Sequence, residues 1–122
     1  MEKLLAFFEI PAADFGRAVK FYESVFQFKL AVSECEEEKM AFFPAGEEEV
    51  AGAISWAEGF EPSGKGVLIH FQVEDISDVL TRVERQGGMM IRPKTKIECE
   101  NRGYFAMFRD SEGNTVGLYS DK

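Results

Sequence analysis

The feature that most constrains this chain is an internal repeat. Sliding the sequence by 65 positions aligns residues 40–55 with residues 105–120, and five of the sixteen pairs are identical. The identical pairs are Ala41/Ala106, Phe43/Phe108, Glu47/Glu112, Gly52/Gly117 and Ser55/Ser120. Each segment has an apolar run, a glycine-containing polar turn and a second apolar run, which is typical of a β-hairpin. Because repeated sequence predicts repeated structure, we expect the two halves to share one fold.

A helical pattern precedes the hairpin in both halves. Apolar residues recur with the i, i+3, i+4, i+7 spacing of one helix face in residues 15–26 and again after Asp75. Asp14 and Asp75 each stand directly before the apolar set, where a carboxylate can accept the unpaired N–H groups of the first turn. Gly87 and Gly88 follow the second set and can adopt the left-handed conformation that ends a helix. We therefore predict one helix in each half.

Runs of apolar and β-branched residues predict the strands. The expected strands are residues 3–10, 29–34, 39–44 and 50–56 in the first half, and residues 67–73, 89–94, 104–109 and 115–119 in the second. Residues 58–65 are rich in glycine and proline and are expected to form a linker. The fold class is therefore predicted to be α+β, with a single domain of two βαβββ modules at about residues 1–57 and 66–122.

Composition argues against several classes of protein. The 122 residues carry 14 basic and 22 acidic side chains, a net charge of −8, whereas a nucleic-acid binder needs cationic side chains. Two cysteines cannot form a disulfide framework, and one histidine is too few for a typical histidine-rich metal site. No apolar run approaches the roughly 20 residues of a membrane span, and the run at residues 4–8 is too short for a signal peptide. We expect a cytoplasmic protein that binds neither nucleic acid nor a membrane.

Three stretches of the sequence carry a family resemblance. They are residues 8–14 (FEIPAAD) with 17–18 (RA) and 21–23 (FYE), residues 73–76 (VEDI) with 87–88 (GG), and residues 108–114 (FRDSEGN). They resemble the vicinal oxygen chelate superfamily, whose members include glyoxalase I, bleomycin-resistance proteins and extradiol dioxygenases. The resemblance covers nearly the whole chain and implies two βαβββ modules whose sheets curl around a cleft. It does not specify a reaction, because one fold hosts many functions.

The resemblance also implies where a metal would bind. Enzymes of this superfamily typically hold a divalent metal with four side chains, one from the first strand and one from the last strand of each module. Aligned by motif, these positions fall on Phe7, Gly52, Leu68 and Gly117, and none of these residues can donate a side-chain ligand. The resemblance therefore predicts a protein without a metal ion and without a cofactor.

Strand alternation extends this prediction from the four metal positions to the rest of the cleft, because side chains two residues apart share a face. The predicted lining is Phe7, Glu9, Phe42, Ile54, Trp56, His70, Phe105, Met107 and Tyr119. The residues expected to face the helices instead are Ala41, Phe43, Ala106 and Phe108. An apolar cleft with two polar residues, Glu9 and His70, is typical of a small-molecule site.

The predicted ligand is a small aromatic or cationic molecule. Trp56 can stack on a planar group or hold a cation over its ring. The acidic runs at residues 34–38 and 47–49 form solvated turns in the simplest interpretation, and they can also attract a cation. Glu9 on an apolar face needs a partner, which can be His70, a ligand or a basic side chain at the rim.

Two alternatives stay open beside this binding module. An enzyme of the same superfamily, of the lyase, isomerase or dioxygenase type, could use Glu9 and His70 as acid and base, with or without a recruited divalent metal. A structural or regulatory module could close the cleft with its own side chains. For each of them, the unpaired sheet edges predict a homodimer.

Overall fold

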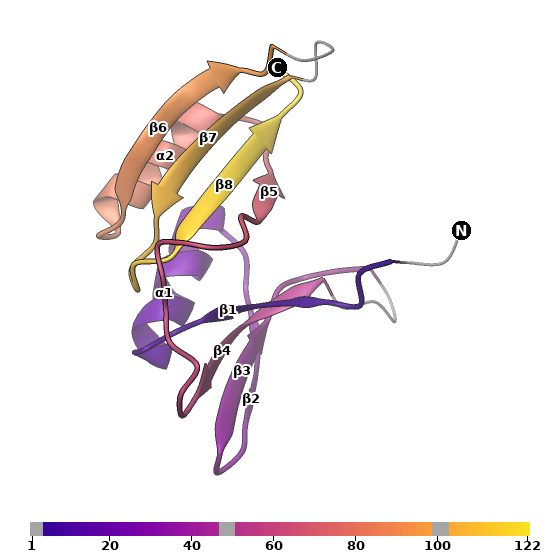
Figure 1. The fold of residues 1–122 in the computed structure, drawn as a ribbon, viewed down its shortest axis with the longest axis vertical. Helices are drawn as coiled ribbons and strands as arrows, with labels where there is room; N and C mark the ends of the chain where they lie inside the picture. The colour runs from indigo at the N-terminus through magenta and orange to yellow at the C-terminus, as the bar shows by residue number, and fades with distance from the viewer. Residues whose placement is uncertain (1–3, 47–50, 99–102) are drawn as a thin grey trace. The chain divides into compact units, whose positions relative to one another are not determined.

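The computed structural model describes residues 4–46, 51–98 and 103–122 (Figure 1). The chain divides into two compact units, Met1–Pro62 and Ser63–Lys122, and the boundary lies inside the segment 58–65. Each unit contains one helix and one four-stranded sheet in the order βαβββ. The predicted α+β class and the repeated module are therefore confirmed.

The first and the last strand of the first unit form a parallel pair. Its elements are β1 (Phe8–Pro11), α1 (Phe15–Phe26), β2 (Ala31–Glu34), β3 (Glu38–Phe42) and β4 (Gly52–Ala57). The sheet order is β1-β4-β3-β2, in which β1 runs parallel to β4 and the other neighbours are antiparallel. The crossover from β1 passes through α1, as parallel pairing requires.

Helix α1 begins and ends as the sequence predicts. The Asp14 carboxylate accepts a hydrogen bond from the Arg17 N–H at 3.1 Å, and the helix stops at Gln27, which is left-handed with φ 58°. The buried side of the helix consists of Ala18, Phe21, Tyr22 and Val25. The Tyr22 ring packs edge-on against the Phe43 ring, with 5.6 Å between centroids, so α1 covers the face of the sheet that Phe43 shares.

The second unit repeats this arrangement. Its elements are β5 (His70–Gln72), α2 (Ile76–Arg85), β6 (Met89–Lys96), β7 (Tyr104–Arg109) and β8 (Thr115–Ser120), in the sheet order β5-β8-β7-β6. Figure 1 shows α2 lying along one face of this sheet. The Asp75 carboxylate accepts from the Asp78 N–H at 3.1 Å, and Gly87, with φ 92°, lies just beyond the helix end. Both aspartate caps and the left-handed glycine stop are therefore confirmed.

The core of the second unit lies between α2 and the sheet. Its buried apolar residues are Ile76, Val79, Leu80 and Val83 from the helix and Ala106, Phe108, Val116 and Leu118 from the strands. Fully burying one such large apolar side chain contributes about 1.5–3 kcal/mol. The predicted helix-facing positions Ala106 and Phe108 are confirmed, because both have no exposed surface.

The first strand of each unit is shorter than the sequence suggests. β1 starts at Phe8, where pairing with Gly52 begins, and β5 covers only three of the seven residues predicted. The length of an edge strand is set by the residues that pair with its single neighbour. The apolar content of the sequence alone does not predict where this pairing begins. Residues 1–3, Val50 and the acidic run at residues 47–49 lie outside the described residues.

The turn between β7 and β8 is held by a buried carboxylate. Asp110, 4% exposed, accepts hydrogen bonds from the Glu112 N–H at 2.8 Å and the Asn114 N–H at 2.9 Å. Its second oxygen accepts from the Asn114 side-chain amide at 3.0 Å. The amide oxygen of Asn114 in turn accepts from the Ser63 N–H at 3.0 Å. The FRDSEGN motif therefore builds the turn and anchors the chain that enters the second unit.

Neither helix in the described part of the chain is both long enough and apolar enough to span a membrane.

Candidate functional site

Each sheet has two faces with different roles. The helix face packs on the helix of its own unit, and the open face lies on the opposite side. Strand register assigns every strand residue to one face, because directly paired residues share a face and neighbours along a strand alternate. Each unit therefore has one open face, and each open face is a candidate binding surface.

The open face of the second sheet carries the side chains that alternation predicts. Met107 and His70 both pair with Gly117, and Phe105 pairs with Tyr119. The strand residues on this face are His70, Gln72, Met89, Arg92, Thr95, Phe105, Met107, Arg109, Thr115, Gly117 and Tyr119. The prediction that His70, Phe105, Met107 and Tyr119 share one face is therefore confirmed.

His70 is held by its neighbours on this face. Its ring meets the Phe105 ring edge-on at 6.5 Å, and its Nδ1 lies 3.4 Å from the Leu118 carbonyl oxygen. Gly117 makes room for the imidazole, because a Cβ at this position would overlap the His70 ring. The exposed His70 is thus positioned by one glycine and one aromatic ring.

The first sheet corrects part of the predicted lining. Glu9 and Phe42 both pair with Ala53, so these residues lie on the open face. Ile54 pairs with Ile10 and Ala41 on the helix face, where it has no exposed surface. The prediction that Ile54 and Trp56 share a face with Glu9 is therefore wrong, although a role for either residue in binding stays a prediction.

The error comes from the length of the first hairpin. Ten residues separate Phe42 from Ala53, whereas nine separate Met107 from Gly117. An alignment without gaps misses this extra residue, and a shift of one residue moves every side chain of a strand to the other face. The counterpart of Gly117 in the first unit is therefore Ala53.

Trp56 lies beside the start of α1. Together with Ala13, Asp14, Phe15, Gly16, Glu34 and Lys39, it lines a hollow of about 560 Å³. The Lys39 Nζ is 5.6 Å from the centroid of the Trp56 ring, within the range of a cation–π contact. The half-buried indole thus already has a cation beside it.

The four implied metal positions offer no donor atoms. Phe7 and Leu68 are 46% and 37% exposed, and Gly117 has no side chain. Gly52 lies on the helix face, and its open-face counterpart Ala53 carries only a methyl group. Metal ligands in proteins are nitrogen, oxygen or thiolate sulfur, so these residues do not fit the family's metal. Within residues 4–46, 51–98 and 103–122, no three His, Cys, Asp or Glu residues cluster as a metal site requires.

Glu9 has a partner that the sequence does not predict. The Ser55 hydroxyl donates a hydrogen bond to the Glu9 carboxylate at 2.7 Å. Glu9 pairs with Ala53, and His70 pairs with the counterpart of Ala53, Gly117. Glu9 and His70 therefore occupy equivalent places in their own sheets.

Two arginines on the open face of the second sheet were absent from the predicted site. Arg92 pairs with Met107, and its guanidinium lies 5.7 Å from the centroid of the Phe105 ring. Arg109 pairs with Thr115, whose hydroxyl oxygen accepts a 2.9 Å hydrogen bond from Arg109 Nε. Alternation from Met107 could have found Arg109. Alternation along β6 could not have found Arg92, because the register shifts on either side of this residue.

Charge is divided unequally between the two units. Residues 1–62 contain five Lys and Arg against thirteen Asp and Glu, a net charge of −8. Residues 63–122 contain nine of each, a net charge of zero. The whole acidic excess of the chain therefore belongs to the first unit.

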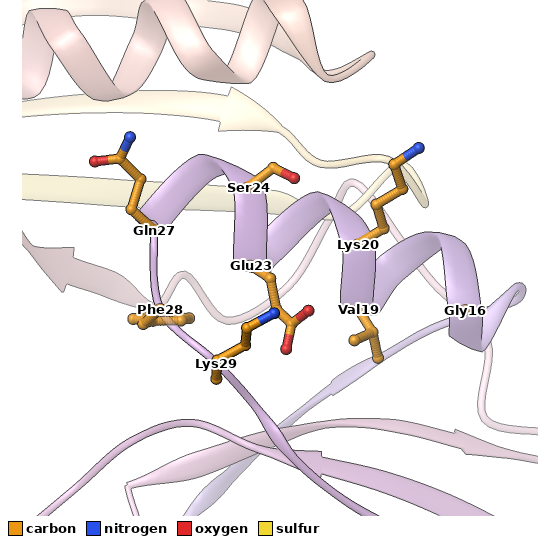
Figure 2. Close-up of a pocket in the computed structure, with 8 residues that line it drawn as sticks. All are labelled: Gly16, Val19, Lys20, Glu23, Ser24, Gln27, Phe28 and Lys29. Atoms are coloured by element: carbon orange, nitrogen blue, oxygen red, sulfur yellow. The ribbon is translucent and has the colours of Figure 1, made fainter.

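A second hollow, of about 430 Å³, lies along α1 (Figure 2). Figure 2 shows Glu23 and Lys29 extending toward one another at its lower side, beneath the helix. The Glu23 carboxylate accepts a 2.8 Å hydrogen bond from the Leu30 N–H and so holds the segment that leads from α1 to β2. Glu23 therefore has a structural role at this hollow, which is to fix the segment after α1.

The fold defines a class of α+β proteins built from paired βαβββ modules, and solved structures of that class are similar to this chain. A mutant of glyoxalase I from Zea mays matches with a TM-score of 0.74 and 18% identity over 96% of this chain, which spans only 46% of the maize chain. A glyoxylase/bleomycin resistance protein/dioxygenase domain from Frankia sp. EAN1pec matches over 100% of both chains, with a TM-score of 0.74 and 14% identity. A glyoxalase/bleomycin resistance protein/dioxygenase family enzyme from Burkholderia phytofirmans PsJN matches with a TM-score of 0.71 and 16% identity. The match covers 96% of this chain and 98% of the Burkholderia chain.

The family follows from the sequence itself. The model of the Glyoxalase/Bleomycin resistance protein/Dioxygenase superfamily matches residues 4–118, so the chain belongs to this superfamily. Comparison with curated proteins finds no match. At these low identities the structural similarities establish the fold, and the reaction or ligand has to be argued from the site.

Proposed function

We propose that this chain is a metal-independent, small-molecule-binding member of the superfamily. The observation that carries the proposal is the set of residues at the implied metal positions, Phe7, Ala53, Leu68 and Gly117, none of which has a donor atom in its side chain. Without metal donors at these four positions, the open faces offer shape, apolar contact and a few polar groups. Those are the properties of a binding site for a small organic molecule.

An aromatic ligand suits the open faces best. Phe42 on the first sheet and Phe105, Met107 and Tyr119 on the second are half-buried. Flat aromatic rings and a polarizable thioether stack well on a planar partner. We expect such a ligand to gain most of its affinity from these side chains.

Metal analysis tests the first part of this proposal. The protein is purified without chelator, incubated with zinc or nickel, desalted and analysed by mass spectrometry, and glyoxalase activity is assayed with each metal. The expected result is a small fraction of one metal ion per chain and no activity. Stoichiometric retention of either metal would contradict the proposal.

A thermal-shift screen of aromatic metabolites and antibiotics tests the second part, because a ligand that binds the native state raises the apparent stability. Phe105→Ala should weaken binding of a hit by roughly 1–3 kcal/mol, as expected for the loss of an aromatic anchor. Phe60→Ala is the matched control, since Phe60 is 38% exposed and follows the last strand of the first unit. Equal binding by the wild type and both variants would contradict the assignment of Phe105. A screen without a single hit would favour a structural module whose open faces are covered.

The second candidate is an acid–base enzyme that uses Glu9 and His70. Their equivalent places on the two sheets and their exposure favour it. A carboxylate and an imidazole can exchange protons near neutral pH without a metal. If a substrate is found, loss of turnover in both Glu9→Gln and His70→Gln with unchanged ligand affinity would support the enzyme over the binding protein.

We also propose a homodimer. Strands β1 and β2 form the edges of the first sheet, and β5 and β6 form the edges of the second. Unpaired strand edges favour association with another chain. Light scattering at micromolar concentration should give twice the 13.8 kDa mass of the chain, and a mass of one chain would contradict the proposal.

A further inference from the structure

We propose that the open face of the second sheet binds the carboxylate of a small aromatic acid, with Arg92 and Arg109 as the anion-binding groups. This inference rests on the proposed small-molecule function and specifies the charge of the ligand. The acidic composition of the chain suggests a cationic ligand, whereas this inference assigns an anionic one.

Arg92 is placed as the outer anion-binding group. Its guanidinium lies over the Phe105 ring, 5.7 Å from the centroid, and the side chain is exposed. No carboxylate pairs with it among the described residues. Stacking on a ring leaves the edge of a guanidinium, with its N–H donors, available to a planar acceptor. Arg92 therefore combines an aromatic platform with donors at one place on the sheet.

Arg109 is placed as the inner anion-binding group. Its Nε donates to the Thr115 hydroxyl oxygen, and the same hydroxyl donates to the Gly64 carbonyl oxygen at 2.8 Å. Gly64 lies so close that a Cβ there would be 2.7 Å from Arg109 Cζ. These contacts hold the half-buried guanidinium in one orientation. Its terminal Nη groups have no hydrogen-bond acceptor in the described part of the chain.

The two arginines occupy diagonal positions on neighbouring strands of the same face. Arg92 pairs with Met107, and Arg109 lies two residues further along β7 on the same face. Such diagonal positions in an antiparallel pair are about 7–8 Å apart, a distance that two long side chains span easily. A carboxylate accepts parallel hydrogen bonds from a guanidinium fork, which makes it the best-matched small anion.

The charges on the strands of this face favour an anion. Its described strand positions include two arginines and a histidine but no Asp or Glu. The unit as a whole is neutral, whereas the first unit carries the net charge of −8. An acid bound on this face meets two arginines, one of which lies beside an aromatic ring.

The test compares three ligands of nearly equal shape: cinnamate, neutral cinnamide and cationic cinnamylammonium. Dissociation constants are measured by calorimetry and by the shifts of backbone NMR signals. Cinnamate should bind about tenfold more tightly than the amide, because charge-assisted hydrogen bonds to arginine are roughly twice as strong as neutral ones. The shifts should centre on strands β6 and β7.

Variants separate the roles of the two arginines. Arg92→Gln and Arg109→Gln should each reduce cinnamate affinity about tenfold and leave cinnamide affinity nearly unchanged. Lys96→Gln is the matched control, because it removes the same charge from β6 at a position that pairs with Tyr104 on the helix face. If Arg109→Gln fails to fold, the exposed Arg92→Gln still decides the question.

The outcomes distinguish this inference from the proposed function. Equal or tighter binding of the amide or the cation overturns the aromatic-acid inference and leaves small-molecule binding standing. Equal loss of affinity in Lys96→Gln also overturns it, because the effect would then come from net charge alone. Failure of all three ligands to bind, in a protein whose screen has yielded other ligands, again overturns only this inference. Failure of every ligand in both experiments overturns both proposals.

Discussion

The Ser55 hydroxyl donates a 2.7 Å hydrogen bond to the Glu9 carboxylate and so joins neighbouring strands on the open face of the first sheet. Ser55 is 3% exposed, so its hydroxyl has little access to other partners. Ser55→Ala should therefore lower the free energy of unfolding by about 1 kcal/mol. Urea denaturation measures this loss, and Ser33→Ala, at an exposed position on β2, should change it little. Equal effects of the two substitutions would show that the hydrogen bond contributes nothing to stability.

The register of β4 can be tested through its buried face. Ile54→Ala should cost roughly 2–5 kcal/mol, because the residue has no exposed surface and its loss leaves a cavity facing α1. Val32→Ala, at a 51% exposed position of the same sheet, should cost less than about 0.5 kcal/mol. A small effect of Ile54→Ala in urea denaturation would place Ile54 on the open face and restore the gapless alignment of the two halves.

Gly117 should tolerate no side chain without a displacement of His70. A Cβ in Gly117→Ala would overlap the imidazole, so the ring has to leave its present position beside Phe105. Since His70 is the only histidine, its ring protons give an isolated pair of NMR signals, and these should shift clearly.

Gly16→Ala is the control for this substitution, because only the Asp14 carboxylate comes within 4 Å of its added Cβ, at 3.9 Å. It should leave the His70 signals in place and stabilise α1 by up to about 1 kcal/mol. Unchanged His70 signals in Gly117→Ala would contradict the placement of the ring.

The Asp110 carboxylate should be one of the most sensitive polar groups of the second unit. It accepts three hydrogen bonds inside the β7–β8 turn, and Asp110→Ala leaves their donors without this acceptor. We expect a loss of about 2–3 kcal/mol in the free energy of unfolding. Ser111→Ala, in the same turn, should cost less than about 1 kcal/mol, because its hydroxyl donates one hydrogen bond, to the neighbouring Glu112 carboxylate. A loss in Asp110→Ala no larger than that control would show that water replaces the carboxylate.

Local patterns in the sequence predict most of the fold. The helix periodicity and the caps at Asp14 and Asp75 depend on residues within two turns of each other, so short-range physics is sufficient. The β7 strand was predicted at its observed bounds, Tyr104–Arg109, because it alternates strictly between the helix face and the open face. The same alternation correctly groups His70 with Phe105 and Tyr119.

What the sequence could not predict depends on pairing between distant residues. The extra residue between Phe42 and Ala53 changes which side Ile54 faces, and no property of Ile54 itself reveals this. The partnership of Glu9 with Ser55 joins positions 46 residues apart, and Arg92 is brought beside Phe105 by irregular pairing in β6. Contacts of this kind depend on the register in which the strands pair, and local sequence does not specify that register.

The one-residue difference between the hairpins also bears on the history of the chain. Two of the five identities that reveal the repeat, Gly52/Gly117 and Ser55/Ser120, join positions that are not equivalent in three dimensions. If the halves descend from one duplicated module, an insertion or a deletion between the paired strands of one hairpin has since shifted the sequence offset by one residue, while the strand residues kept their faces. Reconstruction of that ancestor should therefore align Ala53 with Gly117 and Ser55 with Tyr119. A symmetric protein made from two copies of one half would inherit a single hairpin length and with it two identical open faces, either both with a carboxylate or both with an imidazole.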